Sequence, residues 1–404
     1  MASRAVLGGL ASRILPGLEE RAYNRARDRA VSEFMKSDAY GGRLAGIPHG
    51  QAPSLDARPH LVIVPMEGSA HSTWKPAGGN FFYEITQSAR EYVGDHADVT
   101  VFDVLPGEAM ADWHERLIRF LLESDATHLM AQIESDPNPP AESTWELLWT
   151  QLAPRWPGVF LGVMFDSGFR MITFGARRLA RISDRFMVVD ICVPMDGQMV
   201  RGRPEVGPVS MPISNESFAE IDRQIGTVAK IHDVSFIGAL YPYRVEMIDA
   251  LRAEGIHVAV NPHRPDETGD FASSRANQPT YVDYMRGLAE SRMTINFAMA
   301  SSLAGHQLKT RVLEATGVGT VVITDDVDRS SRFWGPGEGI AYFRDTSEVP
   351  AIAARYLSDP SLLAAEQEAG RARARAINVS SFWGGVDEGL ARRGLAPLTR
   401  VDQR

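Results

Sequence analysis

The chain has 404 residues, of which 44% are hydrophobic and 23% are charged, a composition typical of a folded protein. This length suits two α/β domains, because one domain usually spans roughly 100 to 200 residues. The formal net charge of −9 argues against a nucleic-acid scaffold, since clustered cations drive phosphate-backbone binding. The single cysteine, Cys192, excludes internal disulfides and cysteine-based metal clusters and favours a cytoplasmic location.

The first residues predict a helical extension over 1–55. They lack the small-residue cleavage signature of a signal peptide, and no apolar run in the chain approaches the roughly 18 residues of a membrane span. Arginines alternate with leucine and isoleucine over residues 1–30, a pattern that suits peripheral contact with the anionic inner face of a membrane. Because acidic residues are interspersed, the alternative is a solvated helix that packs on the first domain.

Short apolar runs alternate with helical patterns through the first half of the chain. The runs lie at 61–64, 99–102, 128–133, 159–165 and 186–191. Continuous apolar runs of this kind are typical of parallel strands buried on both faces, and the intervening helical spacing completes a strand–helix–strand repeat. The pattern therefore predicts a doubly wound α/β domain over residues 56–205.

A second α/β domain is predicted over residues 232–378. The region 206–231 is interpreted as the linker, because the Gly-, Pro- and Ser-rich stretch 201–218 has no periodicity. A complete βαβ element follows it, and its helix ends at Gly255. The two strands of this element are expected at 234–238 and 256–260. Three further strands are expected at 293–297, 320–324 and 340–343. By analogy with two-lobed proteins, the tail 379–404 is expected to cross back to the first domain.

The segment 281–343 carries the side chains best suited to chemistry. A strand leads through a Ser/Gly-rich loop into a helix with Lys309, Arg311 and Glu314, the arrangement by which open α/β sheets bind phosphates. Fixed cations such as Lys309 and Arg311 could neutralise a leaving diphosphate in place of a metal. Glu314 could accept hydrogen bonds from both ribose hydroxyls, a binding role. The alternative is an ordinary i, i+3 ion pair between Arg311 and Glu314.

Four pieces of the second half are similar to glycosyltransferases related to the spore-maturation protein CgeB. They are SFIGALYPYR, YVDYMRGLAESRMTINF, HQLKTRVLEATGVGTVVIT and FWGPGEGIAYF, and they lie within residues 232–380. The third piece is the most specific, because Lys-x-Arg-x-Leu-Glu-Ala is followed by a Gly-containing turn and a hydrophobic strand. The resemblance implies a GT-B fold, in which two Rossmann-like domains face a cleft, and a hexosyltransferase-type activity.

The resemblance also implies roles for individual residues. Glu314 matches the glutamate that holds the nucleotide ribose, and Gly238 and Arg244 match a glycine turn and an arginine facing the donor diphosphate. Glu338 matches a position in a loop closing on the donor. We therefore expect a UDP- or GDP-linked sugar as the donor and no metal. The acidic clusters 134–137 and 325–332 agree with this, because neither has EF-hand or zinc-ligand spacing.

Three residues are candidates for catalysis. Retaining relatives often carry a second glutamate eight residues before the ribose glutamate, and His306 occupies that position here, so retaining and inverting mechanisms both stay open. In the N-terminal half, His71 lies in the loop after the first strand, and Asp166 ends a buried strand where a general base could project. For each of the three, a structural or solvated side chain is the alternative.

Two other functions compete with a glycosyltransferase. A sugar-nucleotide epimerase shares the two-lobed architecture and nucleotide pocket but needs no acceptor. A non-catalytic sugar-binding or scaffold protein is the second alternative, because His306 departs from the family pattern. The sequence leaves the acceptor open among a glycan, a lipid, a protein and a small molecule, and predicts no nucleic-acid partner.

Overall fold

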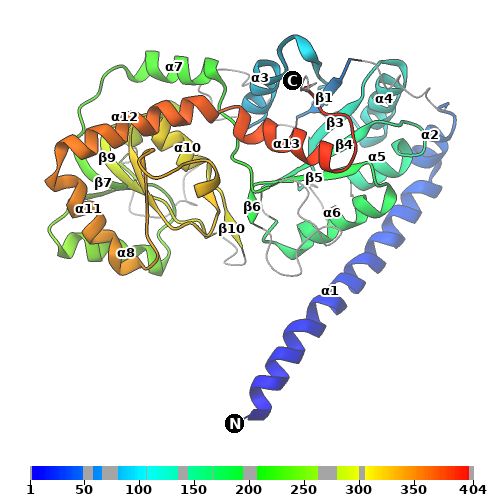
Figure 1. Ribbon diagram of the computed structural model, residues 1–404. Helices are drawn as coiled ribbons and strands as arrows, with labels where there is room; N and C mark the ends of the chain where they lie inside the picture. The colour runs from blue at the N-terminus through cyan, green and yellow to red at the C-terminus, as the bar shows by residue number, and fades with distance from the viewer. Residues whose placement is uncertain are drawn as a thin grey trace.

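Two α/β domains lie side by side in the computed structural model, with one long helix projecting from the N-terminal domain (Figure 1). The structure describes residues 2–48, 58–65, 81–105, 107–134, 144–165, 167–193, 207–262, 280–299 and 305–399, with side chains from residue 17 onward. Within these residues, no helix is long and apolar enough to cross a membrane.

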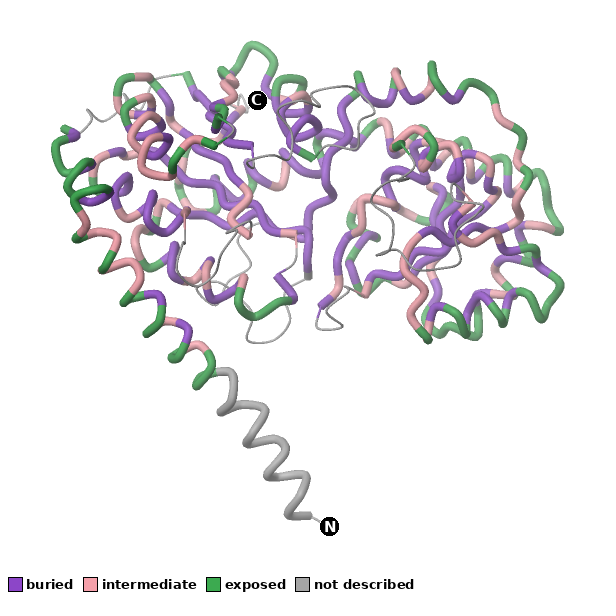
Figure 2. The backbone as a smooth tube through the Cα atoms, turned by 180° about the vertical axis from the view of Figure 1, so that it is seen from behind, coloured by how far each residue is buried: buried purple, intermediate pink, exposed green. Residues whose placement is uncertain are grey.

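The N-terminal domain is built on a five-stranded parallel sheet in the order β2-β1-β3-β4-β5. Its strands are β1 (His60–Val64), β2 (Asp98–Val101), β3 (His128–Gln132), β4 (Val159–Met164) and β5 (Phe186–Asp190). Every residue of β1, β4 and β5 is buried, which explains their continuous apolar runs (Figure 2). The predicted strand positions are confirmed to within one or two residues at each end.

Helices cover both faces of this sheet, so each face has its own apolar core. They are α3 (Phe81–Val93), α4 (Met110–Glu123), α5 (Thr144–Leu152) and α6 (Arg170–Ile182), with a short 3-10 helix η2 (Gly94–His96). Amphipathic spacing directs Trp113, Leu117 and Leu121 of α4 inward, as the sequence pattern predicts. The core beneath α4 and α5 is aromatic, with Trp149 and Phe160 in edge contact at 5.4 Å.

The long helix α1 (Ala2–Lys36) packs on α5 and α6 through its C-terminal half. Tyr23 contacts Phe174 at 5.7 Å between ring centroids, and Glu19 pairs with Arg170 at 2.9 Å. A π-helix, η1 (Asp38–Gly42), and the short α2 (Arg43–Ala45) then lead toward the sheet. The C-terminal half of α1 and the segment that follows it therefore pack on the first domain.

The C-terminal domain repeats the same topology. Its parallel sheet has the order β12-β11-β9-β7-β8. The strands are β7 (His232–Phe236), β8 (Val258–Val260), β9 (Ser291–Ile295), β11 (Val321–Thr324) and β12 (Ile340–Tyr342). In both sheets the strands follow the order 2-1-3-4-5, a doubly wound arrangement whose chain direction reverses between the first and third strands.

The helices of this domain again cover both faces of the sheet. They are α7 (Asn215–Ile225), α8 (Pro242–Ala253), α9 (Tyr281–Ala289), α10 (Thr310–Gly317), α11 (Val349–Ser358) and α12 (Pro360–Ile377), with 3-10 helices η4 (Ser330–Arg332) and η5 (Thr346–Glu348). Helix α7 lies inside the predicted linker, which is a difference from the sequence interpretation. Its Ser214 cap and buried Phe218 and Ile221 make it part of the second domain's core.

The chain crosses between the domains twice and also joins them through a small sheet. Strand β6 (Cys192–Val193) of the first half pairs antiparallel with β10 (His306–Gln307) of the second. Helix α13 (Ser380–Arg392) returns to the N-terminal domain, where Trp383 is fully buried and its indole N–H donates to Ser88 Oγ at 2.8 Å (Figure 1). The C-terminal tail therefore completes the first domain's core.

Two glutamates of α3 hold the N-terminus of α7. Glu84 accepts from Ser214 N at 2.7 Å and from Ser217 Oγ at 2.5 Å, and Glu91 accepts from Asn215 N at 2.9 Å. Carboxylates at a helix N-terminus satisfy free N–H groups and complement the helix dipole. Glu84 is 5% exposed, and burial raises the pKa of its carboxyl to about 7 despite the serine hydrogen bonds. This junction ties the first domain to the second.

The raised pKa of Glu84 predicts a pH-dependent stability. A carboxyl whose pKa is raised by folding stabilises the protein while it is protonated, and that contribution is lost as the pH rises through about 7. From about pH 5 to about pH 8, the free energy of unfolding of the wild type should fall relative to that of Glu84→Gln by about 3 kcal/mol. Urea unfolding of both proteins across this range measures the difference.

The control is Glu91→Gln, which removes an exposed carboxylate from the same helix N-terminus. A difference between Glu84→Gln and the wild type that stays constant with pH would contradict the proposed protonation of Glu84.

Candidate functional site

The topology places one edge of the second sheet where ligands bind in doubly wound folds. Such ligands lie beyond the carboxyl ends of the strands at the point where the winding reverses, here between β7 and β9. The residues that follow β7, the first turn of α8 and the residues that follow β9 meet at this point. Gly238, Arg244 and Phe297 come from these three segments.

The turn after β7 depends on glycine at position 238. Gly238 has φ +140°, a backbone conformation that residues other than glycine rarely adopt. Its N–H donates to Asn261 Oδ1 at 2.8 Å, and the Asn261 amide donates back to Gly238 O at 3.3 Å. Asn261 itself has φ +46° and is buried. The turn is therefore fixed on both sides by hydrogen bonds.

Arg244 is a buried cation held by aromatic rings. It is 8% exposed, and its guanidinium lies 4.7 to 5.7 Å from the centroids of Phe236, Tyr241, Tyr243 and Phe297. Its Nη1 donates to Ala239 O, and its Nε donates to Tyr243 Oη, both at 3.0 Å. These contacts orient the group without neutralising its charge.

Arg311 brings a second guanidinium to the same turn. A Cβ atom on Gly238 would lie 3.7 Å from Arg311 Nη2 and 3.8 Å from Arg244 Nη1. Arg311 Nε is buried and has no hydrogen-bond partner among the described residues. Within the same part of the chain, neither arginine forms an ion pair with a carboxylate. Two guanidinium groups that form no ion pair within the described residues therefore meet at a glycine turn, which is an arrangement suited to an anion.

Glu314 lies one turn further along the helix that carries Arg311, and two tyrosines hold it. Tyr281 Oη donates to Glu314 Oε1 at 2.8 Å, and Tyr284 Oη donates to Oε2 at 2.6 Å. Burial raises the pKa of the Glu314 carboxyl, while the two phenols and the positive charge of Arg311 oppose that rise. The i, i+3 ion pair expected as an alternative between Arg311 and Glu314 is not among the salt bridges of the described residues.

Lys309 stands at the beginning of α10. It occupies the N-cap position without making a side-chain cap, so the first N–H groups of the helix stay free of a side-chain acceptor. Its ammonium donates to Gln307 Oε1, and the Gln307 amide donates to Phe165 O of the first domain at 2.6 Å. Lys309 is thus tied to the domain junction, and the helix N-terminus adds positive potential beside Arg311.

His306 lies at the junction between the two domains. It pairs with Val193 across the β6–β10 sheet, and the preceding Gly305 would place a Cβ atom 3.5 Å from Gly168 Cα. Burial raises the pKa of Asp325 at the end of β11, and a positive charge on His306 opposes this rise, so the two side chains influence one another. The segment that carries His306 therefore joins the two domains.

Glu338 lies apart from the other predicted donor residues. It precedes β12 and therefore stands at the amino edge of the sheet, opposite the carboxyl edge that carries Gly238. Its Oε2 accepts from Gly335 N at 2.5 Å and lies 3.5 Å from Arg373 Nε. The structure does not bring Glu338 to the cluster formed by Gly238, Arg244, Arg311 and Glu314. Glu338 instead stabilises the Gly-Pro-Gly turn that precedes it, because its carboxylate accepts from the N–H of Gly335, and it contacts Arg373 of α12.

The remaining predicted residues, Asp166 and His71, lie outside the described residues. Among those described, no group of three or more His, Cys, Asp or Glu side chains could hold a metal ion.

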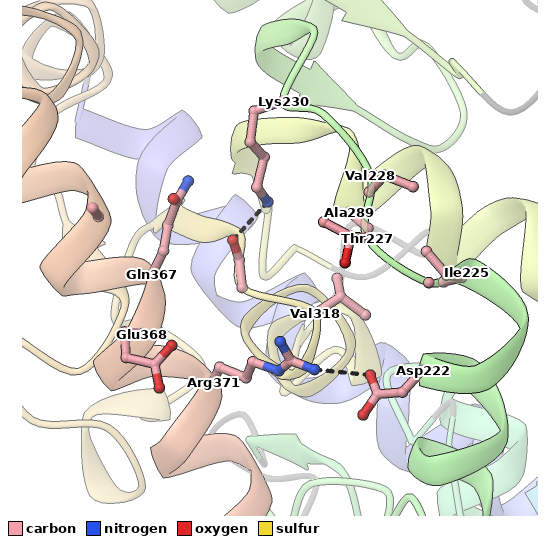
Figure 3. A pocket seen from close by; sticks show the side chains of 13 residues that line it. Asp222, Ile225, Thr227, Val228, Lys230, Ala289, Val318, Gln367, Glu368 and Arg371 are labelled. Carbon is pink, nitrogen blue, oxygen red and sulfur yellow. Dashed lines mark hydrogen bonds and ion pairs between the residues drawn. The ribbon is translucent and has the colours of Figure 1, made fainter.

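A cavity of about 470 Å³ opens at the amino edge of the second domain, away from this cluster (Figure 3). Lys230 lines this cavity, and its ammonium donates to Ser291 O at 2.9 Å and to Gly319 O at 2.6 Å. Figure 3 shows Arg371 paired with Asp222, at 3.0 Å. Lys230 therefore joins the segments at the beginning of β9 and β11, and Arg371 joins α12 to α7, so both side chains have structural roles.

Sequence reasoning missed three residues of the cluster. Tyr281 and Tyr284 are spaced i, i+3, which places both phenols on one face of a helix, and Asn261 follows a strand in the position of a turn clamp. The spacing of the tyrosines was readable, but the carboxylate that they meet lies 30 and 33 residues further along the chain.

Residues 244–379, about a third of the chain, match the model of a family described as glycosyl transferase-like. A comparison with curated proteins finds no match. The fold is similar to an alpha-glucosyltransferase solved with UDP-glucose and DNA containing an abasic site, at a TM-score of 0.53 and 12% identity, over 83% of this chain and 99% of that chain.

Two further solved structures are similar to this chain: Anabaena HepE, in complex with UDP and glucose, and AviGT4, a glycosyltransferase involved in avilamycin A biosynthesis. HepE has a TM-score of 0.48 and 14% identity, over 82% of this chain and 99% of that chain. AviGT4 has a TM-score of 0.46 and 16% identity, over 83% of this chain and 98% of that chain. The fold prediction is confirmed: the chain has the GT-B fold, with two Rossmann-like domains.

Proposed function

We propose that this protein is a metal-independent glycosyltransferase that uses a nucleotide-sugar donor. One observation carries the proposal: the guanidinium groups of Arg244 and Arg311, which form no ion pair within the described residues, meet at Gly238, at the point where doubly wound sheets bind ligands. A diphosphate fits two planar cations, because each can donate paired hydrogen bonds to phosphate oxygens. Glu314, one turn beyond Arg311, is the ribose-binding carboxylate in this proposal.

The chemistry requires stabilisation of the leaving group. The bond between the sugar's anomeric carbon and the diphosphate oxygen breaks, a new bond forms to the acceptor oxygen, and the acceptor proton passes to a base. Arg244, Arg311 and the free N-terminus of α10 would neutralise the diphosphate charge as it develops. No step in this scheme needs a divalent ion.

The family match supports the same location. The matched residues 244–379 include Arg244, Arg311 and Glu314. The alpha-glucosyltransferase of similar fold was solved with UDP-glucose, which supports a UDP-linked donor here, with a GDP-linked donor as the alternative. We also retain the narrower proposal that the chain is CgeB-like and transfers a hexose. Its acceptor belongs to one of four classes: glycan, lipid, protein or small molecule.

The acceptor side is proposed to be the carboxyl edge of the first sheet. Residues 165 and 168 of this edge contact the segment that carries His306. His306 is proposed to orient the donor sugar, and Asp166 and His71, which follow β4 and β1, are proposed as acceptor-side residues.

The donor site is tested by titration with nucleotides. We expect saturable binding of UDP or GDP, unchanged by EDTA or Mg²⁺, in calorimetry or thermal-shift measurements with UDP, GDP, ADP and dTDP. A ligand at about 100 times its Kd should add roughly 2.7 kcal/mol of apparent stability. Arg244→Met and Arg311→Met should each weaken binding by about 10- to 100-fold, because each removes a charge-assisted contact to phosphate.

Arg252→Met is the matched control, since Arg252 lies on the same helix as Arg244 but is exposed and close to Asp249. Binding that requires Mg²⁺ would contradict the metal-independent proposal. Failure of the wild type to bind any nucleotide would favour a non-catalytic scaffold. Conversion of a sugar nucleotide without an acceptor would favour an epimerase.

The proposed role of His306 predicts a separation of binding from turnover. His306→Ala should lower kcat for sugar transfer or donor hydrolysis by about 10- to 1,000-fold, because sugar orientation is lost. The Kd for the free nucleoside diphosphate should stay within about 2-fold of the wild-type value, since the cations and Glu314 are untouched. A nucleotide Kd that weakens as much as turnover would instead assign His306 to diphosphate binding.

Contact with an anionic membrane is proposed for α1. Arg21, Arg25 and Arg29 are spaced i, i+4, i+8 and exposed, opposite the face that buries Tyr23 and Arg27. Sedimentation with phosphatidylserine vesicles should show binding that falls steeply with salt and is lost when all three arginines become glutamine. Equal binding to neutral vesicles would argue against this electrostatic contact.

A further inference from the structure

We infer that Tyr281 and Tyr284 preset the Glu314 carboxylate for the cis-diol of a ribose, so that the site selects ribonucleotides over 2′-deoxynucleotides. The inference rests on the proposed function, because it assigns the sugar specificity of the same nucleotide site. It excludes sugars linked to 2′-deoxythymidine diphosphate as donors and identifies the two tyrosines as positioning residues.

The two phenols come from one helix and act on two different oxygens. Tyr281 and Tyr284 lie on α9 with their rings stacked, the centroids 5.8 Å apart and the planes at 20°. Tyr281 Oη is 2.8 Å from Glu314 Oε1, and Tyr284 Oη is 2.6 Å from Oε2. Because both ends of the carboxylate are held, its plane cannot rotate about the terminal bond of the side chain.

This arrangement leaves acceptor capacity for one more partner at each oxygen. A carboxylate oxygen can accept about two hydrogen bonds, so each phenol uses about half of the capacity of the oxygen it touches. The free lone pairs of Oε1 and Oε2 lie in one plane and are spaced for two neighbouring hydroxyl groups. The 2′- and 3′-hydroxyls of a ribose are such a pair, whereas a 2′-deoxyribose offers only one donor.

Burial makes the missing hydroxyl costly. Glu314 is 7% exposed, so an oxygen left without its second donor cannot readily be hydrated in a bound complex. Arg311 is close to Gly238 and also influences this carboxylate: its Nη2 lies 3.7 Å from the position that a Cβ atom on Gly238 would occupy, and its charge acts on Glu314. The ribose position and the diphosphate position are therefore adjacent, in the order that a nucleoside diphosphate requires.

A purely structural role for the tyrosines gives a different expectation. If the phenols only fastened α9 to α10, their loss would lower stability and weaken ribonucleotide and deoxyribonucleotide binding by the same factor. A positioning role changes the ratio of the two affinities. The ratio is therefore the readout that separates the two roles.

The experiment is calorimetric titration of the full-length protein with UDP and 2′-deoxyUDP, and with the GDP and ADP pairs in parallel. We expect the wild type to bind the ribonucleotide of its preferred pair about 10- to 100-fold more tightly. Tyr281→Phe and Tyr284→Phe should each reduce this ratio, and the double variant should bring it below about 3-fold. The loss should come from weaker ribonucleotide binding, with the deoxynucleotide Kd nearly unchanged.

Two variants serve as comparisons. Glu314→Gln should abolish the ratio in the same way, since its amide cannot accept from both hydroxyls. Tyr243→Phe removes a phenol that contacts Arg244 and should weaken both nucleotides by one factor, which leaves the ratio intact. Thermal unfolding identifies variants that are folded, and the wild-type ratio and Glu314→Gln test the inference even if the double tyrosine variant is unstable.

Equal affinity of the wild type for a ribonucleotide and its deoxy form would overturn the inference while leaving the donor site in place. So would tyrosine variants that weaken both nucleotides equally. Failure of every nucleotide to bind would overturn the proposed function itself, so the two failures are distinguishable.

Discussion

The site depends on two arginine side chains that meet at one glycine and form no ion pair with any carboxylate in the described part of the chain. Cations held together repel one another, and the fold brings Arg244 and Arg311 within 4 Å of the same point on Gly238. Aromatic rings hold Arg244 from one side, and Asn261 fixes the turn from the other. The arrangement is stable in the free protein only at an electrostatic cost, which a bound anion would offset.

The repeated topology explains why this cluster lies where it does. Both sheets follow the same doubly wound order, so each has a reversal point at its carboxyl edge. In the second domain the reversal point carries glycine, cations and a carboxylate. The β6–β10 sheet and the contact of Gly305 with Gly168 join the carboxyl edges of the two sheets. A donor on one side and an acceptor on the other would therefore meet at the segment that carries His306.

Much of the fold could be predicted from the sequence, because continuous apolar runs and βαβ spacing are local signals. The position of Glu338 could not be predicted from a local motif. Its Gly-Glu motif suits a loop that closes on a donor, yet the parallel pairing of β12 with β11 puts Glu338 at the amino edge of the sheet, opposite the edge that carries Gly238. Helix α7 was hidden in a Gly- and Pro-rich stretch because its stabilising partners, Glu84 and Glu91, lie on α3. The contact of Tyr281 and Tyr284 with Glu314 required the packing of two helices that sequence spacing alone does not specify.

Helix α10 and the domain junction are parts of one connected structure. Lys309 precedes α10 and contacts Gln307, and the Gln307 amide donates to Phe165 O of the first domain. The helix that carries Arg311 and Glu314 is thus tied to the first domain at its N-terminal end. Any change in the angle between the domains must be absorbed by these same contacts, since α13 and β6 hold the chain crossings in place. Nucleotide binding and domain arrangement are for this reason expected to be coupled through α10 rather than through the distant cavity beside Lys230.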